Sequence, residues 1–109
     1  MVVMNIDIVA HDLELTPALK EYINMRLSGV DKFLGRIGEG SDLYMQVEVA
    51  RITRHHRKGN VFSAKAVFRV LGNDIRAEAE GEDARVVIDV LKDKIADEIK
   101  KFKEKKEEK

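Results

Sequence analysis

The sequence predicts an α+β domain with the element order β-α-β-β-β-α, a two-layer sandwich in which two helices pack on one face of a four-stranded mixed sheet. Four segments alternate apolar and polar residues, the period of a half-buried strand. Two further segments, 17–34 and 84–102, repeat apolar residues at helical spacing. The helix between the first two strands makes them parallel through a right-handed crossover, and the shorter later connections make the remaining strands antiparallel.

The first strand is expected over residues 2–9 and the first helix after Thr16. Thr16 is a good N-cap, and Pro17 suits the first helical position because its missing N–H is not needed there. Gly29 is expected inside this helix, where glycine costs about 1 kcal/mol relative to alanine. The apolar residues that set the helical spacing are Leu19, Ile23, Leu27, Val30 and Leu34.

Three more strands are expected over 43–50, 62–70 and 75–79, with a tight turn at 71–74 where Gly72 and Asn73 tolerate positive φ. The last helix is expected to start near Asp83, where carboxylates complement the positive end of a helix. The opposite face of the sheet is expected to remain solvent-exposed because the outward residues are mostly polar. They are Asn5, Asp7, Tyr44, Gln46, Glu48, Lys65, Arg69, Arg76 and Glu78.

Composition favours one domain over residues 1–102, followed at 103–109 by a charged helix end that is expected to fray. The chain of 109 residues has no cysteine, which excludes disulfides and thiolate chemistry. No segment reads as a membrane span or a signal peptide, so we expect a cytoplasmic protein without a membrane partner.

The formal net charge of zero conceals a basic centre. Residues 51–76 hold seven basic side chains and one acidic side chain, a local charge of +6. Such a field attracts polyanions whatever the global balance is. The alternative is that folding places these cations among acidic neighbours.

Catalytic and metal-binding patterns have little support. His55 and His56 are adjacent and supply two ligands at most, whereas zinc sites need three or four, and His11 lies in another connection. Histidines in a basic loop more often donate hydrogen bonds to phosphate or base edges, unless the loop is simply solvated. No hydroxyl is paired with a histidine, and no phosphate-binding glycine loop is present. We therefore expect no enzyme, no cofactor and no small-molecule substrate.

The basic residues form the stronger pattern. Arginine binds phosphate through planar bidentate contacts and lysine as a point charge, and a surface of this kind recognises RNA shape more than sequence. The alternative is that these cations only form weak surface ion pairs with acids such as Asp89, Asp93 and Asp97. The sequence supports this alternative for the last helix, but not for residues 51–58, where no acid occurs. The candidate RNA-binding residues are Arg26, Lys32, Arg36, Arg51, Arg54, His55, His56, Arg57, Lys58, Arg76, Arg85, Lys92, Lys94 and Lys100.

A family resemblance covers nearly the whole chain. Residues 76–83 read Arg-Ala-Glu-Ala-Glu-Gly-Glu-Asp and precede the helical pairs Ile88-Asp89 and Asp93-Lys94. Residues 15–23 read Leu-Thr-Pro-Ala-Leu-Lys-Glu-Tyr-Ile, and Lys32-Phe33-Leu34 follows with Arg36-Ile37. Together and in this order they resemble the ribosome hibernation-promoting factors, also called ribosome-associated inhibitors.

The resemblance implies a stress-response protein that binds the small ribosomal subunit and its RNA in the mRNA and tRNA channel. Translation would stop because the protein sterically occludes the A and P sites. Arg85, Val86 and Val87 depart from the family, which often has tyrosine and small residues there, and the 54–60 loop is longer and more basic than in many short members. The chain resembles a short form without a second dimerising domain, and we expect a monomer away from the ribosome.

Two alternatives remain open at this stage. The first is a general binder of double-stranded RNA without preference for the ribosome. The second is a protein-interaction module that uses the exposed sheet face, with Tyr44, Val67 and Arg69 as anchors.

Overall fold

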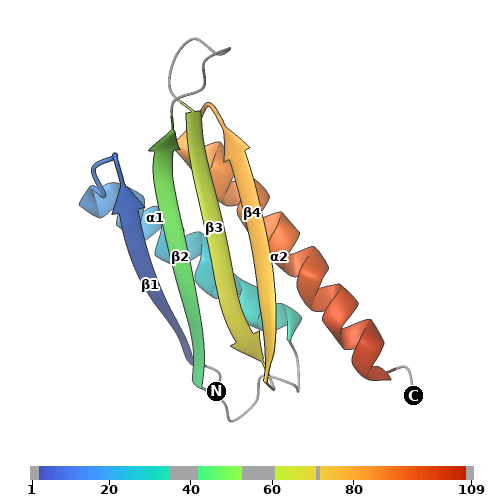
Figure 1. The fold of residues 1–109 in the computed structure, drawn as a ribbon. Coiled ribbons are helices and arrows are strands. Elements are labelled where there is room, and N and C mark those ends of the chain that lie inside the picture. Colours follow the sequence, from blue (N-terminus) through green and yellow to red (C-terminus); the bar gives the residue numbers. More distant parts are fainter. Residues whose placement is uncertain (1–2, 35–41, 53–60, 71, 108–109) are drawn as a thin grey trace.

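The computed structural model describes residues 3–34, 42–52, 61–70 and 72–107. Its elements follow the predicted order and form a sheet with two helices on one side (Figure 1). They are β1 (Val3–His11), α1 (Pro17–Ser28), the 3-10 helix η1 (Gly29–Phe33), β2 (Asp42–Ile52), β3 (Val61–Val70), β4 (Asn73–Gly81) and α2 (Ala84–Glu107).

The sheet has the strand order β1-β2-β3-β4, so β1 and β4 are its edges. β1 is parallel to β2, whereas β2 with β3 and β3 with β4 are antiparallel. Both the mixed topology and the fold class predicted from the sequence are confirmed. Because the register is continuous, rows of side chains cross the sheet; one row joins Glu48, Lys65 and Glu78.

The start of α1 follows the sequence, and its end does not. The Thr16 hydroxyl accepts a hydrogen bond from the Leu19 N–H at 3.1 Å, as an N-cap does, and Pro17 takes the first position. The expectation that Gly29 lies inside the helix is wrong, since α1 ends at Ser28 and Gly29 is its C-cap. The chain continues as the 3-10 turn η1, which keeps Val30 and Leu34 buried. Spacings of three and four suit both helix types, so apolar periodicity alone does not detect the change.

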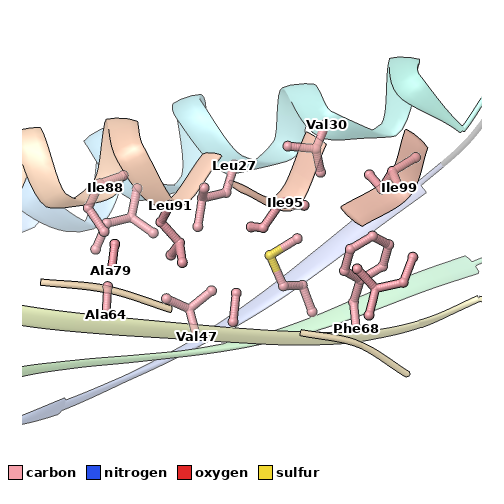
Figure 2. Close-up of a cluster of buried hydrophobic side chains, with 14 of the residues drawn as sticks. Leu27, Val30, Val47, Ala64, Phe68, Ala79, Ile88, Leu91, Ile95 and Ile99 are labelled. Carbon is pink, nitrogen blue, oxygen red and sulfur yellow. The ribbon is translucent and has the colours of Figure 1, made fainter. Parts of the chain in front are cut away.

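The core fills the space between the sheet and the two helices (Figure 2). Small residues on β3 and β4, among them Ala64, Ala66 and Ala79, are buried under α2. At Gly81 an added Cβ would lie 3.1 Å from Cγ2 of Val87, which shows how closely α2 approaches the end of β4. Among the described residues, no charged or polar residue is buried.

Helix α2 begins at Ala84, close to the predicted position. A carboxylate oxygen of Asp83 accepts hydrogen bonds from the N–H groups of Arg85 and Val86 at 2.9 and 3.4 Å. The helix continues through Glu107. Fraying of residues 103–109 concerns motion and stays a prediction.

Candidate nucleic-acid interface

The two faces of the molecule carry different charge. The open face of the sheet presents the alternate residues that the sequence predicts as outward, and all of these are exposed. On this face Lys65, Arg69 and Arg76 stand among five carboxylates, a formal charge of −2. The carboxylates belong to Asp7, Glu48, Asp74, Glu78 and Glu80.

Three basic strand residues of the 51–76 segment lie beside acidic neighbours. The Asp74 carboxylate lies 3.1 Å from Nε of Arg69 and 3.4 Å from an Nη atom of Arg76. The hydrogen bond from Arg69 is the largest cause of a lowered Asp74 pKa, with smaller contributions from the charges of both arginines. Lys65 lies in register between Glu48 and Glu78. For these three cations, the alternative that folding places them among acids is the correct one.

The β1 side of the open face is also internally paired. The Tyr44 hydroxyl donates to Asp7 at 3.2 Å, and partial burial followed by this hydrogen bond raises the pKa of Tyr44. His11 Nε2 lies 2.8 Å from a carboxylate oxygen of Glu48. This face therefore offers few unpaired charges to a polyanion.

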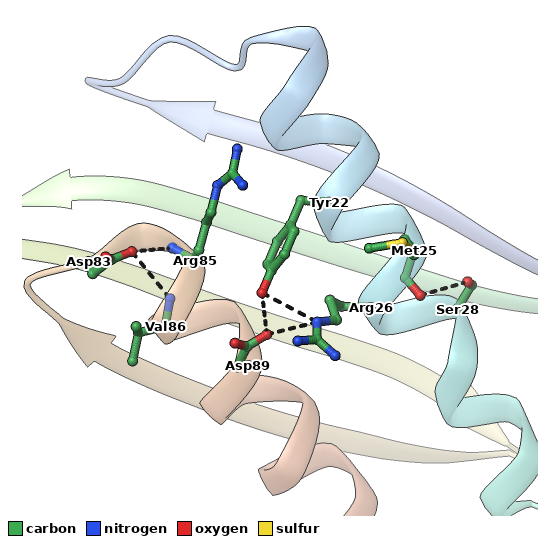
Figure 3. A network of polar contacts seen from close by, with 8 residues as sticks. All are labelled: Tyr22, Met25, Arg26, Ser28, Asp83, Arg85, Val86 and Asp89. Carbon is green, nitrogen blue, oxygen red and sulfur yellow. Dashed lines mark hydrogen bonds and ion pairs between the residues drawn. The ribbon is translucent and has the colours of Figure 1, made fainter.

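The helix side begins with a cluster that joins α1 to α2 (Figure 3). The Tyr22 hydroxyl donates to Oδ1 of Asp89 at 2.7 Å and accepts from Nε of Arg26 at 3.3 Å. Arg26 also forms an ion pair with Asp89 at 3.0 Å. The hydrogen bond to Tyr22 and then the charge of Asp89 raise the pKa of Arg26. The guanidinium of Arg85 lies 5.1 Å from the centroid of the Tyr22 ring.

One stripe of α2 continues from this cluster toward η1. Steps of three or four residues place its members on one side of a helix. Asp89 contacts α1, and Lys103 Nζ donates to the Phe33 carbonyl of η1 at 3.2 Å, so this stripe faces the first helical segment. Its members are Arg85, Asp89, Lys92, Ala96, Lys100 and Lys103.

We define the helix face as this stripe together with Arg26, Lys32 and the nearby Asp93, whose charge also raises the pKa of Arg26. Six cations stand against these two carboxylates, a formal charge of +4, and Asp97 and Glu104, which lie beside Lys100 and Lys103, lower it to +2. The helix face, rather than the open sheet face, is therefore the stronger attractor of phosphate among the described parts of the chain.

The structure brings some of the predicted RNA-binding residues together and separates others. Arg26, Lys32, Arg85, Lys92 and Lys100 lie on the helix face. Arg51 is exposed at the end of β2, and Arg76 lies on the open sheet face. Lys94 lies on the β4 side of α2, where its Nζ donates to the Glu78 carbonyl at 3.0 Å. The remaining predicted residues lie outside the described residues; these are Arg36, Arg54, His55, His56, Arg57 and Lys58.

Two contributors to the helix face are absent from the sequence-based set. Lys103 belongs to it through the contact with η1, and its signal was the three-residue step from Lys100. Tyr22 organises Arg26 and Asp89, and its only signal was a position on the edge of the apolar stripe.

Other kinds of site find no support in the described part of the chain. No group of three histidine or acidic side chains there could hold a metal ion. No described helix is both long and apolar enough to cross a membrane.

Fold and surface together define a two-layer α+β domain with a cationic helix face. The chain belongs to the sigma 54 modulation protein / S30EA ribosomal protein family, whose model matches residues 6–107. The family resemblance inferred from the sequence is thereby confirmed. Members of this family associate with ribosomes and are not enzymes.

Relatives agree with this assignment, and a solved structure agrees with the fold. A ribosome hibernation promoting factor of Klebsiella oxytoca is 32% identical over 102 residues, which cover 94% of this chain and 96% of the relative. The protein of the same name from Escherichia coli K12 is 29% identical over the same shares. The N-terminal domain of Thermus thermophilus Protein Y has a TM-score of 0.73 at 24% identity and covers 91% of this chain and 99% of that one. At this identity the last comparison shows the fold alone.

Proposed function

We propose that the protein is a ribosome hibernation factor that binds the small ribosomal subunit in the mRNA and tRNA channel. Its body would occupy the A and P sites, so translation would be inhibited by steric exclusion without any chemical step. The observation that carries this proposal is the family match over residues 6–107. A cytoplasmic location, where ribosomes are, belongs to the same proposal.

The helix face is the surface that we propose to lie against ribosomal RNA. Its arginine and lysine side chains, which are exposed or half-buried, can bind phosphates of the RNA backbone, and the helices hold them at fixed spacing. Lys100, for example, is exposed and has no ion-pair partner among the residues that the structure describes. Arg36 and the basic residues of 51–58 remain candidates, and of these only Arg51 lies within the described residues; Arg76 and Lys94 are candidates outside the helix face.

The experiment is co-sedimentation of the full chain with isolated small ribosomal subunits across a salt series, with free duplex RNA as competitor. We expect retention that falls as salt rises, because counterions are released from each neutralised phosphate. Duplex RNA should fail to displace the protein, and addition to a translation assay should then reduce synthesis.

Other outcomes point to the alternatives. Displacement by any duplex of similar length would indicate a general RNA binder. Retention that does not depend on salt would indicate a protein partner, for which the open sheet face with its exposed Tyr44 is the available surface. Absence of binding at every salt concentration would overturn the proposal.

A further inference from the structure

A hollow of about 450 Å³ lies between η1 and the C-terminal half of α2. Its size falls within the ~300–1,000 Å³ range of small-ligand sites. Its lining combines an aromatic ring, a small floor residue, two lysines and two carboxylates. The residues are Phe33, Ala96, Asp97, Lys100, Lys103 and Glu104.

The Phe33 ring is the unusual component, because a large aromatic side chain is left 37% exposed at the edge of the core. Lys103 fixes the backbone at this point by donating to the Phe33 carbonyl at 3.2 Å. Lys32 Nζ lies 5.4 Å from the centroid of the ring. An accessible ring beside cations is the arrangement on which proteins bind unpaired nucleotides, since every base has a π-face and the attached sugar carries a phosphate.

The cations and carboxylates of the hollow suggest which base fits. Lys100 lines the hollow, Lys32 lies beside the Phe33 ring outside the lining, and both are exposed, so they are available to a phosphate. Asp97 and Glu104 would repel a phosphate, but an ionised carboxylate accepts hydrogen bonds through both oxygens. Guanine has an amino donor at N2 beside the N–H at N1, so a single carboxylate can accept two hydrogen bonds from it. That edge is engaged within a duplex and free in an unpaired nucleotide.

We infer that this hollow binds an unpaired guanine nucleotide. Its base lies against Phe33, its phosphate points toward Lys100 and Lys32, and its N–H edge faces Asp97 or Glu104. The inference deepens the proposed function and rests on it where the nucleotide is part of RNA. A free guanine nucleotide has the same chemistry, so the experiment must separate the two sources.

The test is an NMR titration of the full chain, labelled with 15N, with GMP, with AMP and with two short single-stranded RNAs that differ by one central guanine or adenine. Guanine ligands should shift the amide signals around Phe33, Ala96 and Lys100, and AMP should bind several-fold more weakly. Phe33→Leu should weaken guanine binding about tenfold, because stacking contributes roughly 1–3 kcal/mol per base. Phe33→Tyr should retain binding. Met25→Leu is the control: it changes a different exposed apolar side chain, which lies on α1, and should have no effect on guanine binding.

Each outcome decides a point. Tighter binding of the guanine-containing RNA than of GMP supports RNA as the source, and equal binding supports a free nucleotide. Equal shifts from GMP and AMP would overturn the choice of guanine. Shifts scattered over all lysines, or none at all, would overturn the site. Co-sedimentation of Phe33→Leu with small subunits separates the two proposals, since unchanged retention would leave ribosome binding intact while the hollow fails.

Discussion

The helix face and the open sheet face are built from similar numbers of charged residues, and they differ in how those charges meet. On the sheet, each of the three cations lies beside a carboxylate, as with Lys65, which cross-strand register places between Glu48 and Glu78. On the helix face, Arg26 forms an ion pair with Asp89, whereas cations such as Lys100 have no ion-pair partner among the described residues. The number of basic residues in a segment therefore does not determine its electrostatic field until the acidic residues beside it in the fold are known.

The largest expected difference between the two faces is the effect of charge reversal on binding to small ribosomal subunits. Arg85→Glu combined with Lys100→Glu should weaken binding to small subunits by roughly 10- to 100-fold near 100 mM salt and make the salt slope shallower by about 2. The matched control, Lys65→Glu with Arg69→Glu, has the same change in charge on the open sheet face. It should change affinity by less than about threefold. Co-sedimentation measures both, and equal losses would sink the assignment of the helix face.

Neighbouring residues on β3 test the buried side against the open side. Ala66 is 1% exposed beneath α2, so Ala66→Leu should overpack the core and lower the free energy of unfolding by about 1–3 kcal/mol. Val67 points to the open face, so Val67→Leu should change that free energy by less than about 0.5 kcal/mol. Urea denaturation followed by circular dichroism measures both. Similar losses for the two variants would contradict the two-layer arrangement.

Each face also has a tyrosine hydroxyl that donates a hydrogen bond to an aspartate, so the same Asp→Asn substitution can be made on both faces and compared. Asp89→Asn keeps an oxygen for Tyr22 while it removes the charge beside Arg26. We expect RNA affinity to rise by about twofold to fivefold, the size expected for one exposed charge of about 0.5–1 kcal/mol. Asp7→Asn, opposite Tyr44, should leave RNA affinity unchanged. A fluorescently labelled duplex RNA and isolated small subunits are the two ligands to titrate; a fall in affinity for Asp89→Asn would show that Asp89 positions Arg26 for binding.

The smallest expected effect concerns Asp74. Its pKa lies below the ordinary value because Arg69 donates a hydrogen bond to it, with Arg76 adding to the effect. The native state therefore favours the ionised carboxylate, and this stabilisation is present above the ordinary pKa and is lost as pH falls through the native pKa. Arg69→Gln should raise the pKa of Asp74, as measured by NMR titration of its carboxyl carbon. An unchanged pKa would assign the lowering to Arg76 instead.

Local patterns predicted the fold well because its elements follow short-range rules. Alternation identified the outward residues of the sheet, Thr16 and Pro17 marked the start of α1, and Asp83 marked the start of α2. The end of α1 was missed since Leu27, Val30 and Leu34 keep a helical spacing through a 3-10 turn. The candidate surface was only partly predictable. Lys65 and Arg69 meet carboxylates through strand register, Arg76 pairs with Asp74 of its own strand, and Lys103 joins the helix face through a contact 70 residues away in the chain.

Lys94, one of the predicted RNA-binding cations, has a second role at the edge of the sheet. β4 is an edge of the sheet, and an uncovered edge strand is a template on which another chain can add a strand. The Lys94 ammonium donates to the Glu78 carbonyl of that strand and places a positive charge beside it. A second copy that approached this edge would have to displace the lysine and desolvate its charge. The lysine thus protects an exposed edge of the sheet, whatever part it has in binding RNA.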